Sequence, residues 1–581
     1  MSEEDLAKQA MARKFGRRAF LRRSALSAAG ATLAEVAASS TALGLSFSDP
    51  FPELEEITIV QLQALMASGK LTARQLVKEY IARIEAIDRH GPKINTVLEI
   101  NPDALAIADA LDQERRTKGP RGPLHGIPIL LKDNIATADK MQTTAGSLAL
   151  LGSVVPRDAF VAKGLRKAGA ILLGKANLSE WANFRSTASS SGWSGRGGQA
   201  FNPYVLDRSP CGSSSGSAAA VAANLVAVAL GTETDGSILC PSSTNAVVGI
   251  KPTVGLTSRA GVVPIAHSQD TVGPFGRTVA DAAAVLGALT GVDPNDPATA
   301  ASAGKFFTDY TQFLDPNGLK GARIGVARQV YFGYSTKSDA IANAAIARMQ
   351  ELGAVIIDPA NIPTAQQMAS SPDEFTVLLF EFKADVNKYL SGLVSSPVRT
   401  LADLIAFNNA HADRELKFFG QEIFLLAEAT DGLDDPAYLT ALANNHRLSR
   451  DEGIDAVMNQ YNLDALVMPS DSPAWCVDLV DGDHFLGASS QPAALAGYPA
   501  VNVPAGYSFG LPVAMTFMGR AFSEPTLIKL AYAFEQGTKV RHKPHYLLTI
   551  DTESQQQTSS ASRLDESQAS SVKKGEHLQT T

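Results

Sequence analysis

The sequence predicts an α/β protein with a largely parallel sheet, because two hydrophobic patterns alternate along the chain. Short apolar runs typical of fully buried strands lie at 127–131 and 170–174, and a helical pattern at 161–169 separates them. A helix between two buried strands is the usual connection of parallel strands. The chain has 581 residues, of which 45% are hydrophobic and 19% charged, so it can bury a large core.

The other expected elements follow in order along the chain. Residues 58–100 carry apolar side chains at helical spacing with a break at 68–72, and Thr72 is a candidate cap of the second helix. Residues 300–460 are more helical and more charged, which indicates an inserted or peripheral helical layer. The remaining expected elements are helices at 217–224 and 524–535, and strands at 225–230, 465–469, 501–503 and 513–517.

Both ends of the chain read as separate from a single domain at 50–550. Within residues 1–45, Arg17 and Arg18 precede Phe-Leu and a weakly apolar, Ala-rich stretch, a pattern similar to a twin-arginine export signal. We therefore expect export to the periplasm, with a basic arm on a cytoplasmic protein as the alternative. Residues 551–581 are almost entirely polar, which predicts a disordered tail.

Charge, hydropathy and cysteine content exclude several classes of protein. The net charge of −8 comes without a block of Lys and Arg in the body, which argues against nucleic acid as a partner. No apolar run is long enough to span a membrane. Cys211, Cys240 and Cys476 are too few for a disulfide framework, so we expect small buried side chains. A monomer is favoured.

Two Gly/Ser turns are the candidate sites of a serine nucleophile. The long irregular stretch 179–216 ends in a Gly-Ser-Ser-Ser-Gly-Ser loop that begins at Gly212, and long loops of this kind are usually functional. A second Gly turn contains Ser237, and both turns open onto a helix start. Because the first N–H groups of a helix have no partner within it, they can stabilise an oxyanion beside a serine.

A serine nucleophile needs a base, and Lys132 is the candidate. The histidines are scattered, and the two nearest these motifs in sequence, His125 and His267, are expected to be structural. Lysine acts as a base only when it is neutral, and burial favours the neutral form. Lys132 ends the apolar strand at 127–131, and alternation along the strand would direct Asp133 to the other face.

These motifs together resemble the amidase signature family over about residues 55–545. The resemblance lies in Lys-Asp-Asn at 132–134, the loop at 212–217, Thr-Asp-Gly-Ser-Ile at 234–238, Val-Gly-Ile-Lys-Pro-Thr at 248–253 and Gln-Asp-Thr-Val-Gly-Pro at 269–274. The stretches 177–183 and 192–199 are most similar to the peptide amidase branch. The resemblance implies a mixed sheet covered by helices on both faces.

The resemblance also implies a Ser–cisSer–Lys triad that needs no metal or cofactor. In this sequence the nucleophile falls on Ser237, the serine after a cis peptide bond on Ser213, and the base on Lys132. The backbone N–H groups of Thr234, Asp235, Gly236 and Ser237 would form the oxyanion hole. The implied reaction is hydrolysis of a carboxamide to ammonia and an acid through an acyl-enzyme.

The substrate is less closely defined than the reaction. C-terminal amides of peptides are the leading expectation, followed by small carboxamides, with Phe184 and Trp475 as candidate pocket residues. Two alternatives stay open. The chain could be the A-type subunit of a tRNA-charging amidotransferase. The loop at 212–216 also fits G-x-S-x-G, the nucleophile elbow of an α/β-hydrolase esterase, with Ser214 as nucleophile.

Overall fold

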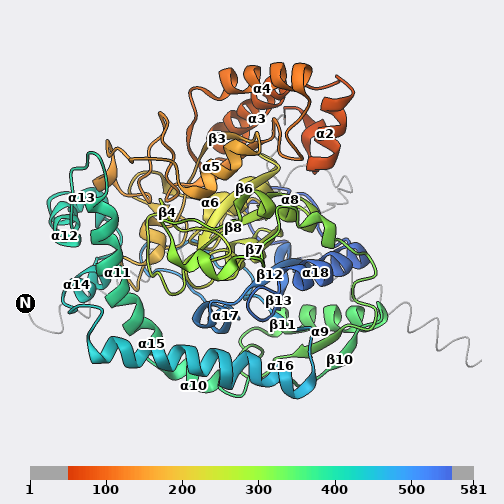
Figure 1. The fold of residues 1–581 in the computed structure, drawn as a ribbon, viewed down its shortest axis with the longest axis vertical. Coiled ribbons are helices and arrows are strands. Elements are labelled where there is room, and N and C mark those ends of the chain that lie inside the picture. Colours follow the sequence, from red (N-terminus) through yellow and green to blue (C-terminus); the bar gives the residue numbers. More distant parts are fainter. Residues whose placement is uncertain (1–49, 553–581) are drawn as a thin grey trace, which may run out of the picture. The chain divides into compact units, whose positions relative to one another are not determined.

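The structure, a computed structural model, describes residues 50–552 (Figure 1). The expected export signal and nearly all of the expected tail therefore lie outside the described residues. The central feature is an 11-stranded sheet with the strand order β1-β3-β2-β6-β8-β7-β12-β13-β11-β9-β10. The strands are β1 (Val97–Ile100), β2 (Pro128–Lys132), β3 (Ile171–Ala176), β6 (Val228–Glu233), β7 (Val248–Lys251), β8 (Thr271–Gly276), β9 (Arg323–Val326), β10 (Val355–Ile357), β11 (Ala465–Pro469), β12 (Ala500–Ser508) and β13 (Leu511–Met518).

The sheet is mixed, so the expectation of a largely parallel sheet is wrong. β2 runs parallel to both β3 and β6, whereas β8 is antiparallel to β6 and to β7. β12 and β13 form an antiparallel hairpin in the other half. A fully buried apolar run has the same composition in either direction, and hydrophobic pattern alone therefore does not report strand direction. The mixed sheet that the family resemblance implies is confirmed.

Helices cover both faces of this sheet. Along β11, Ala465 and Val467 pack with α8, α9 and α18, whereas Leu466 and Met468 pack with α7, α16 and α17. In the other half, α6 packs against β2, β3, β6 and β8, and α5 packs against β3 and α8. These helices are α5 (Phe160–Lys167), α6 (Ser215–Ala222), α7 (Leu239–Thr244), α8 (Val279–Leu289), α9 (Thr336–Glu351), α16 (Asp455–Tyr461), α17 (Gln491–Ala496) and α18 (Glu524–Thr538).

The remaining helices form two further groups. α2 (Ile59–Ala67), α3 (Ala73–Arg83) and α4 (Ala104–Lys118) form the first group, and the hydroxyl of Thr72 accepts the backbone N–H of Gln75 at 3.1 Å, as expected of a helix cap. The second group, which we call the helical layer, is α10 (Ala365–Ser370), α11 (Asp373–Ser391), α12 (Leu401–Ala410), α13 (Ala412–Glu415), α14 (Glu422–Glu428) and α15 (Pro436–Ser449).

The helical layer begins later than the sequence pattern indicates. β9, α9 and β10 fall within the expected helical range of 300–460, but β9 and β10 pair in parallel and complete one edge of the sheet. α11, α12 and α14 pack instead on the loops near Trp181, Phe184 and Ile265. In Figure 1 the layer lies beside the central sheet. Among the described residues, no helix is long and apolar enough to cross a bilayer.

Candidate active site

Lys132 lies at the carboxyl end of β2, between the parallel strands β3 and β6, and is fully buried. Its Nζ atom donates to Ser213 Oγ at 2.7 Å, to Thr232 Oγ1 at 2.8 Å and to the Thr232 carbonyl at 3.2 Å. Burial lowers the pKa of Lys132 to about 7, although the charges of Asp270 and Glu233 act in the opposite direction. Lys132 is thus poised to exchange a proton near neutral pH.

The neighbouring carboxylate does not cancel this effect. Asp133 points away from Lys132: one carboxylate oxygen lies 3.1 Å from Arg196 Nη1, and the other accepts the Thr144 hydroxyl. This orientation agrees with the alternation expected along the strand. Among residues 50–552, Lys132 therefore has hydroxyl and carbonyl oxygens, and no carboxylate, as direct partners.

The loop before α6 brings Ser213 to Lys132. The peptide bond between Gly212 and Ser213 is cis, and the Ser213 side chain is fully buried. The Ser213 carbonyl accepts the backbone N–H of Ser179, and the backbone N–H of Ser214 donates to the Ser237 carbonyl at 3.3 Å. The two Gly/Ser turns that the sequence singles out are therefore neighbours in space.

Ser237 lies in the tight turn between β6 and α7, where Gly236 has a φ of +77°. The carboxylate of Glu233 accepts the N–H groups of Ile238 at 2.6 Å and Leu239 at 2.9 Å. Within residues 50–552, no acceptor bonds the backbone N–H of Asp235, Gly236 or Ser237. Three expected members of the oxyanion hole thus have N–H groups available to a ligand.

The side chains of this turn also suit an anion. Burial, followed by the charge of Glu374, raises the pKa of Asp235, which favours its neutral form. A neutral Asp235 does not repel negative charge that develops beside Ser237. The hydroxyl of Thr234 donates to Asp270 at 2.5 Å and fixes the start of the turn.

The expectation of small buried side chains is confirmed for Cys211 and Cys240 and wrong for Cys476, and the sequence does not predict the pairing of two cysteines. Cys211 and Cys240 form a disulfide, with a Cα–Cα distance of 5.9 Å, and Cys476 is free and exposed. Trp475 packs on the disulfide in a small apolar cluster. The two cysteines lie 29 residues apart in sequence, and only the meeting of the two Gly/Ser turns brings them together.

The two candidate pocket residues have different surroundings. Trp475 lines a cavity of about 580 Å³ beside the disulfide, and its indole N–H donates to Asp483 at 2.9 Å. Phe184 is a core residue: its ring packs edge-on against Phe382 of α11 at 5.1 Å, within a buried cluster. It lines neither this cavity nor the larger one described next.

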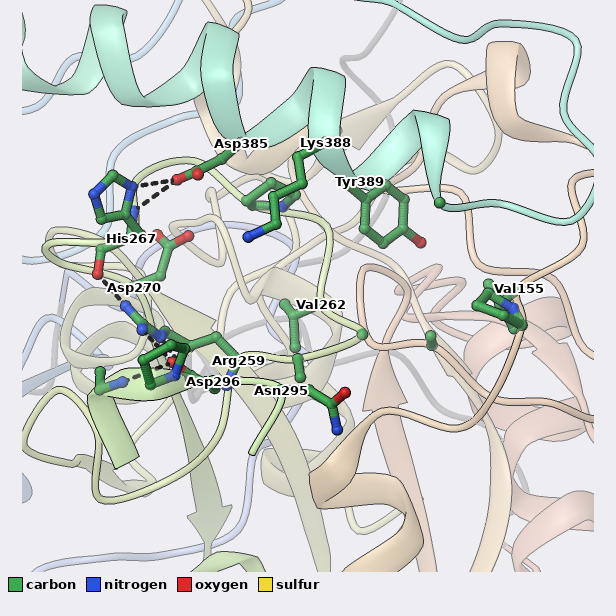
Figure 2. A pocket seen from close by; sticks show the side chains of 18 of the residues that line it. Val155, Arg259, Val262, His267, Asp270, Asn295, Asp296, Asp385, Lys388 and Tyr389 are labelled. Carbon is green, nitrogen blue, oxygen red and sulfur yellow. Dashed lines mark hydrogen bonds and ion pairs between the residues drawn. The ribbon is translucent and has the colours of Figure 1, made fainter. Parts of the chain in front are cut away.

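A larger cavity of about 910 Å³ lies between α11 and the loop at 259–270. Figure 2 shows Asp385, Lys388 and Tyr389 extending from α11 over the loop that carries His267 and Asp270. Asp270 connects this cavity to the site, because it also accepts the Thr234 hydroxyl.

Both histidines near the motifs have partners outside the site. A ring nitrogen of the buried His125 lies 2.9 Å from the Leu111 carbonyl. His267 Nδ1 lies 2.8 Å from Asp385, and its Nε2 lies 3.4 Å from Glu381. His267, Glu381 and Asp385 could together hold a metal ion. In the structure, however, both ring nitrogens face carboxylates, the arrangement of a protonated imidazole.

Sequence reasoning missed several residues that shape the site. Thr232 bonds Lys132 and also accepts the side-chain N–H of Asn134 at 3.0 Å. Glu233 and Asp270 organise the turn that carries Ser237. Asp270 lies inside the Gln-Asp-Thr motif at 269–271, so that motif could have singled it out. Thr232 and Glu233 immediately precede the motif at 234–238 and gave no separate signal.

Comparison with known proteins gives a consistent answer. The Amidase family model matches residues 75–528. The native peptide amidase from Stenotrophomonas maltophilia is 52% identical, with a TM-score of 0.82, and the match covers 86% of this chain and 100% of that one. A protein of Arabidopsis thaliana named probable amidase is 48% identical over 85% of this chain and 92% of its own length. The A subunit of the glutamyl-tRNA(Gln) amidotransferase of Moorella thermoacetica is 36% identical over 84% of this chain and 98% of its own length.

The fold and these similarities define an α/β enzyme that hydrolyses amide bonds. The chain belongs to the amidase signature family, and its solved structural neighbours include peptide amidase. The family resemblance read from the motifs is therefore confirmed.

Proposed function

We propose that this amidase releases ammonia from carboxamides through Ser237, Ser213 and Lys132. The observation that carries the proposal is the 2.7 Å contact between Lys132 Nζ and Ser213 Oγ, made by a lysine whose pKa burial lowers to about 7. A lysine of this kind can accept a proton from a serine hydroxyl.

The proposed reaction proceeds by a proton relay. Neutral Lys132 takes the proton of Ser213, and Ser213 takes the proton of Ser237 as Ser237 Oγ attacks the amide carbon. The N–H groups of Asp235, Gly236 and Ser237 stabilise the oxyanion. The relay returns the proton to the leaving nitrogen, so ammonia departs and an acyl-enzyme forms. Water then adds by the same relay and releases the acid and Ser237.

We propose C-terminal amides of peptides as the preferred substrates. Similarity to the Stenotrophomonas maltophilia peptide amidase supports this choice, at 52% identity with a match that covers 86% of this chain. The cavity beside Trp475 is a candidate site for the residues that precede the amide. It lies next to the disulfide whose cysteines flank Ser213 and Ser237 in sequence.

The environment of Ser214 disfavours the esterase alternative. Ser214 Oγ donates to the Thr232 carbonyl at 3.0 Å and accepts the Thr232 N–H at 3.2 Å, within a fully buried side chain. The Ser214 hydroxyl is thus engaged both as a hydrogen-bond donor and as an acceptor, an arrangement that does not suit a nucleophile. The A subunits of amidotransferases are less similar to the chain than peptide amidase is, which favours a free-standing amidase.

Ammonia release from a panel of amidated peptides and simple carboxamides tests the proposal. We expect the wild-type protein to release ammonia, Ser237→Ala to release almost none, and Ser214→Ala to keep at least about a tenth of the activity. The last figure allows for the loss of a buried hydrogen bond. Full activity of Ser237→Ala would contradict the assignment, and near-complete inactivity of a folded Ser214→Ala would favour the elbow.

We also propose export by the twin-arginine route. The arginine pair at 17–18 supports this proposal. The Cys211–Cys240 disulfide is consistent with it, because disulfides persist mainly in oxidising compartments. Cell fractionation of the full chain should find the protein in the periplasm. Replacement of both arginines with lysine should retain it in the cytoplasm, and periplasmic recovery of that variant would contradict the route.

A further inference from the structure

The Cys211–Cys240 disulfide joins the two turns that carry the proposed serines. Cys211 stands two residues before Ser213, and Cys240 stands three residues after Ser237. The two turns belong to different connections, which lead into α6 and α7. This disulfide is the covalent link between them besides the main chain itself.

Each cysteine is coupled tightly to its own serine through the backbone. The N–H of Cys240 donates to the Gly236 carbonyl at 2.8 Å, so Cys240 and Ser237 share one closed turn. On the other side, the Cys211 carbonyl accepts the Ser215 hydroxyl at 2.6 Å, which closes the loop around Ser213. A shift of either cysteine is thereby transmitted to the serine beside it.

The hydrogen bonds between the two turns constrain the serines less directly than the disulfide does. The contact from Ser214 N–H to the Ser237 carbonyl is long, at 3.3 Å. Thr244 Oγ1 and Asn245 Nδ2 bond the Pro210 carbonyl at 2.9 and 2.8 Å, but they lie at the far end of α7. Two hydrogen bonds between Ser214 Oγ and Thr232 also hold the first loop, but they reach β6 rather than the turn of Ser237, so the disulfide is the covalent constraint close to both serines.

We propose that the Cys211–Cys240 disulfide is a positioning element for amide hydrolysis. It fixes the distance over which the Ser237 proton passes to Ser213, and this inference rests on the proposed function. Lys132 is not part of the link, because it reaches Ser213 from β2. Breaking the disulfide therefore loosens the spacing of the two serines, and the change falls mainly on Ser237, because Lys132 Nζ and the Ser179 N–H still hold Ser213. Turnover should fall, whereas substrate affinity should change little.

The disulfide can be opened chemically. Dithiothreitol supplies two electrons and two protons, its own two thiols close to a cyclic disulfide, and Cys211 and Cys240 become thiols. The reagent must displace or pass Trp475, which packs on the bond. Because the chain has three cysteines in all, titration should find one thiol before reduction and three after it.

The test compares Cys211→Ser/Cys240→Ser with Cys476→Ser as the matched control. Both variants lose cysteine, but only the double variant loses the disulfide. We expect kcat for an amidated peptide to fall about tenfold in the double variant, with KM within about twofold, since a misplacement of about 1 Å can slow a positioned reaction by roughly 10²-fold. Cys476→Ser should lose turnover on reduction, whereas the double variant should not respond to dithiothreitol.

Reversibility separates positioning from simple loss of the fold. If the double variant does not fold, reduction of the wild-type protein replaces it, with circular dichroism to show that the fold persists. Turnover should return when the thiols are reoxidised. An unchanged kcat in the double variant or the reduced protein, or a change confined to KM, would overturn the inference. If the oxidised wild-type protein cleaves no amide, the proposed function fails instead.

Discussion

Two basic side chains of this protein, Lys132 and His267, have opposite electrostatic surroundings. Lys132 is fully buried against hydroxyl and carbonyl oxygens, and burial lowers its pKa to about 7. His267 keeps 43% of its side chain exposed and lies against Asp385 and Glu381. Burial lowers the pKa of His267, but the hydrogen bond with Asp385 and the charge of Glu381 outweigh it, so the pKa is raised.

The difference shows that the pKa of a basic side chain is raised where a carboxylate contacts it directly and lowered where burial acts without such a contact. Two carboxylates, Asp270 and Glu233, act on Lys132 through their charge. Both are hydrogen-bonded to other donors: the Thr234 hydroxyl donates to Asp270, and backbone N–H groups donate to Glu233. They raise the lysine pKa only from a distance. Asp385, by contrast, bonds His267 through both ring and backbone nitrogens. A buried lysine therefore keeps a lowered pKa where the nearby carboxylates are hydrogen-bonded to other donors.

The largest expected effect comes from a base that cannot lose its proton. Lys132→Arg keeps the positive charge and hydrogen-bond donors, but a guanidinium is not deprotonated at any working pH. We expect kcat/KM for an amidated peptide to fall by roughly 10²–10⁴-fold, the range that a general base contributes. The loss should persist from pH 6 to 10. Near-wild-type activity of Lys132→Arg would mean that Lys132 acts only through its charge.

A carboxylate placed beside Lys132 should raise the lysine pKa, as Asp385 raises that of His267. Thr232→Asp replaces a hydroxyl that lies 2.8 Å from Nζ. An adjacent opposite charge raises a lysine pKa by roughly 1–3 units, so activity at pH 7 should fall by roughly 10–10³-fold and recover as the pH rises. Thr232→Ser keeps the hydroxyl and serves as the control. A pH profile identical to that of Thr232→Ser would contradict this reasoning.

The wild-type pH profile should show the weak base directly. Because the neutral form of Lys132 is the active one, kcat/KM should rise with pH and level off above the pKa of about 7. Well below that value the rate should fall by roughly tenfold per pH unit. Initial rates of ammonia release between pH 5 and 9 measure the profile. A flat profile over this range would show that Lys132 does not titrate during the reaction.

The smallest effect concerns stability at His267. The raised pKa contributes stability below the unfolded value of about 6.5, and the contribution is lost as the pH rises through the folded value. Asp385→Asn should therefore cost roughly 0.2–1 kcal/mol at pH 5.5, as expected of an exposed pair, and less at pH 9. Urea unfolding at both pH values measures the difference, with Lys388→Gln as control. Equal losses at both pH values would contradict the assignment.

The sequence predicts the parts of the site that lie in short, continuous patterns. The apolar strand ending at Lys132 and the two Gly/Ser turns before helices all form as expected. What it does not predict depends on pairs of distant segments. Lys132 and Thr232 are 100 residues apart, and the cysteine pairing appears only when the turns meet. Phe184 illustrates a further ambiguity, because an aromatic residue has the same local pattern in a core as in a pocket, and the prediction for this residue stays untested.

The strand order has a consequence for how the protein is made. β1, β3, β2, β6, β8 and β7 all precede residue 277 and are neighbours in the sheet, and along the chain Lys132, Ser213 and Ser237 lie in or between these strands. The free side of β7 is covered by β12, which the ribosome produces only after the whole helical layer. Until β12 is made, the backbone N–H and C=O groups on the open side of β7 are unpaired and can pair with strands of other chains. We expect chaperones to bind the unfinished chain at β7 until β12 closes the sheet.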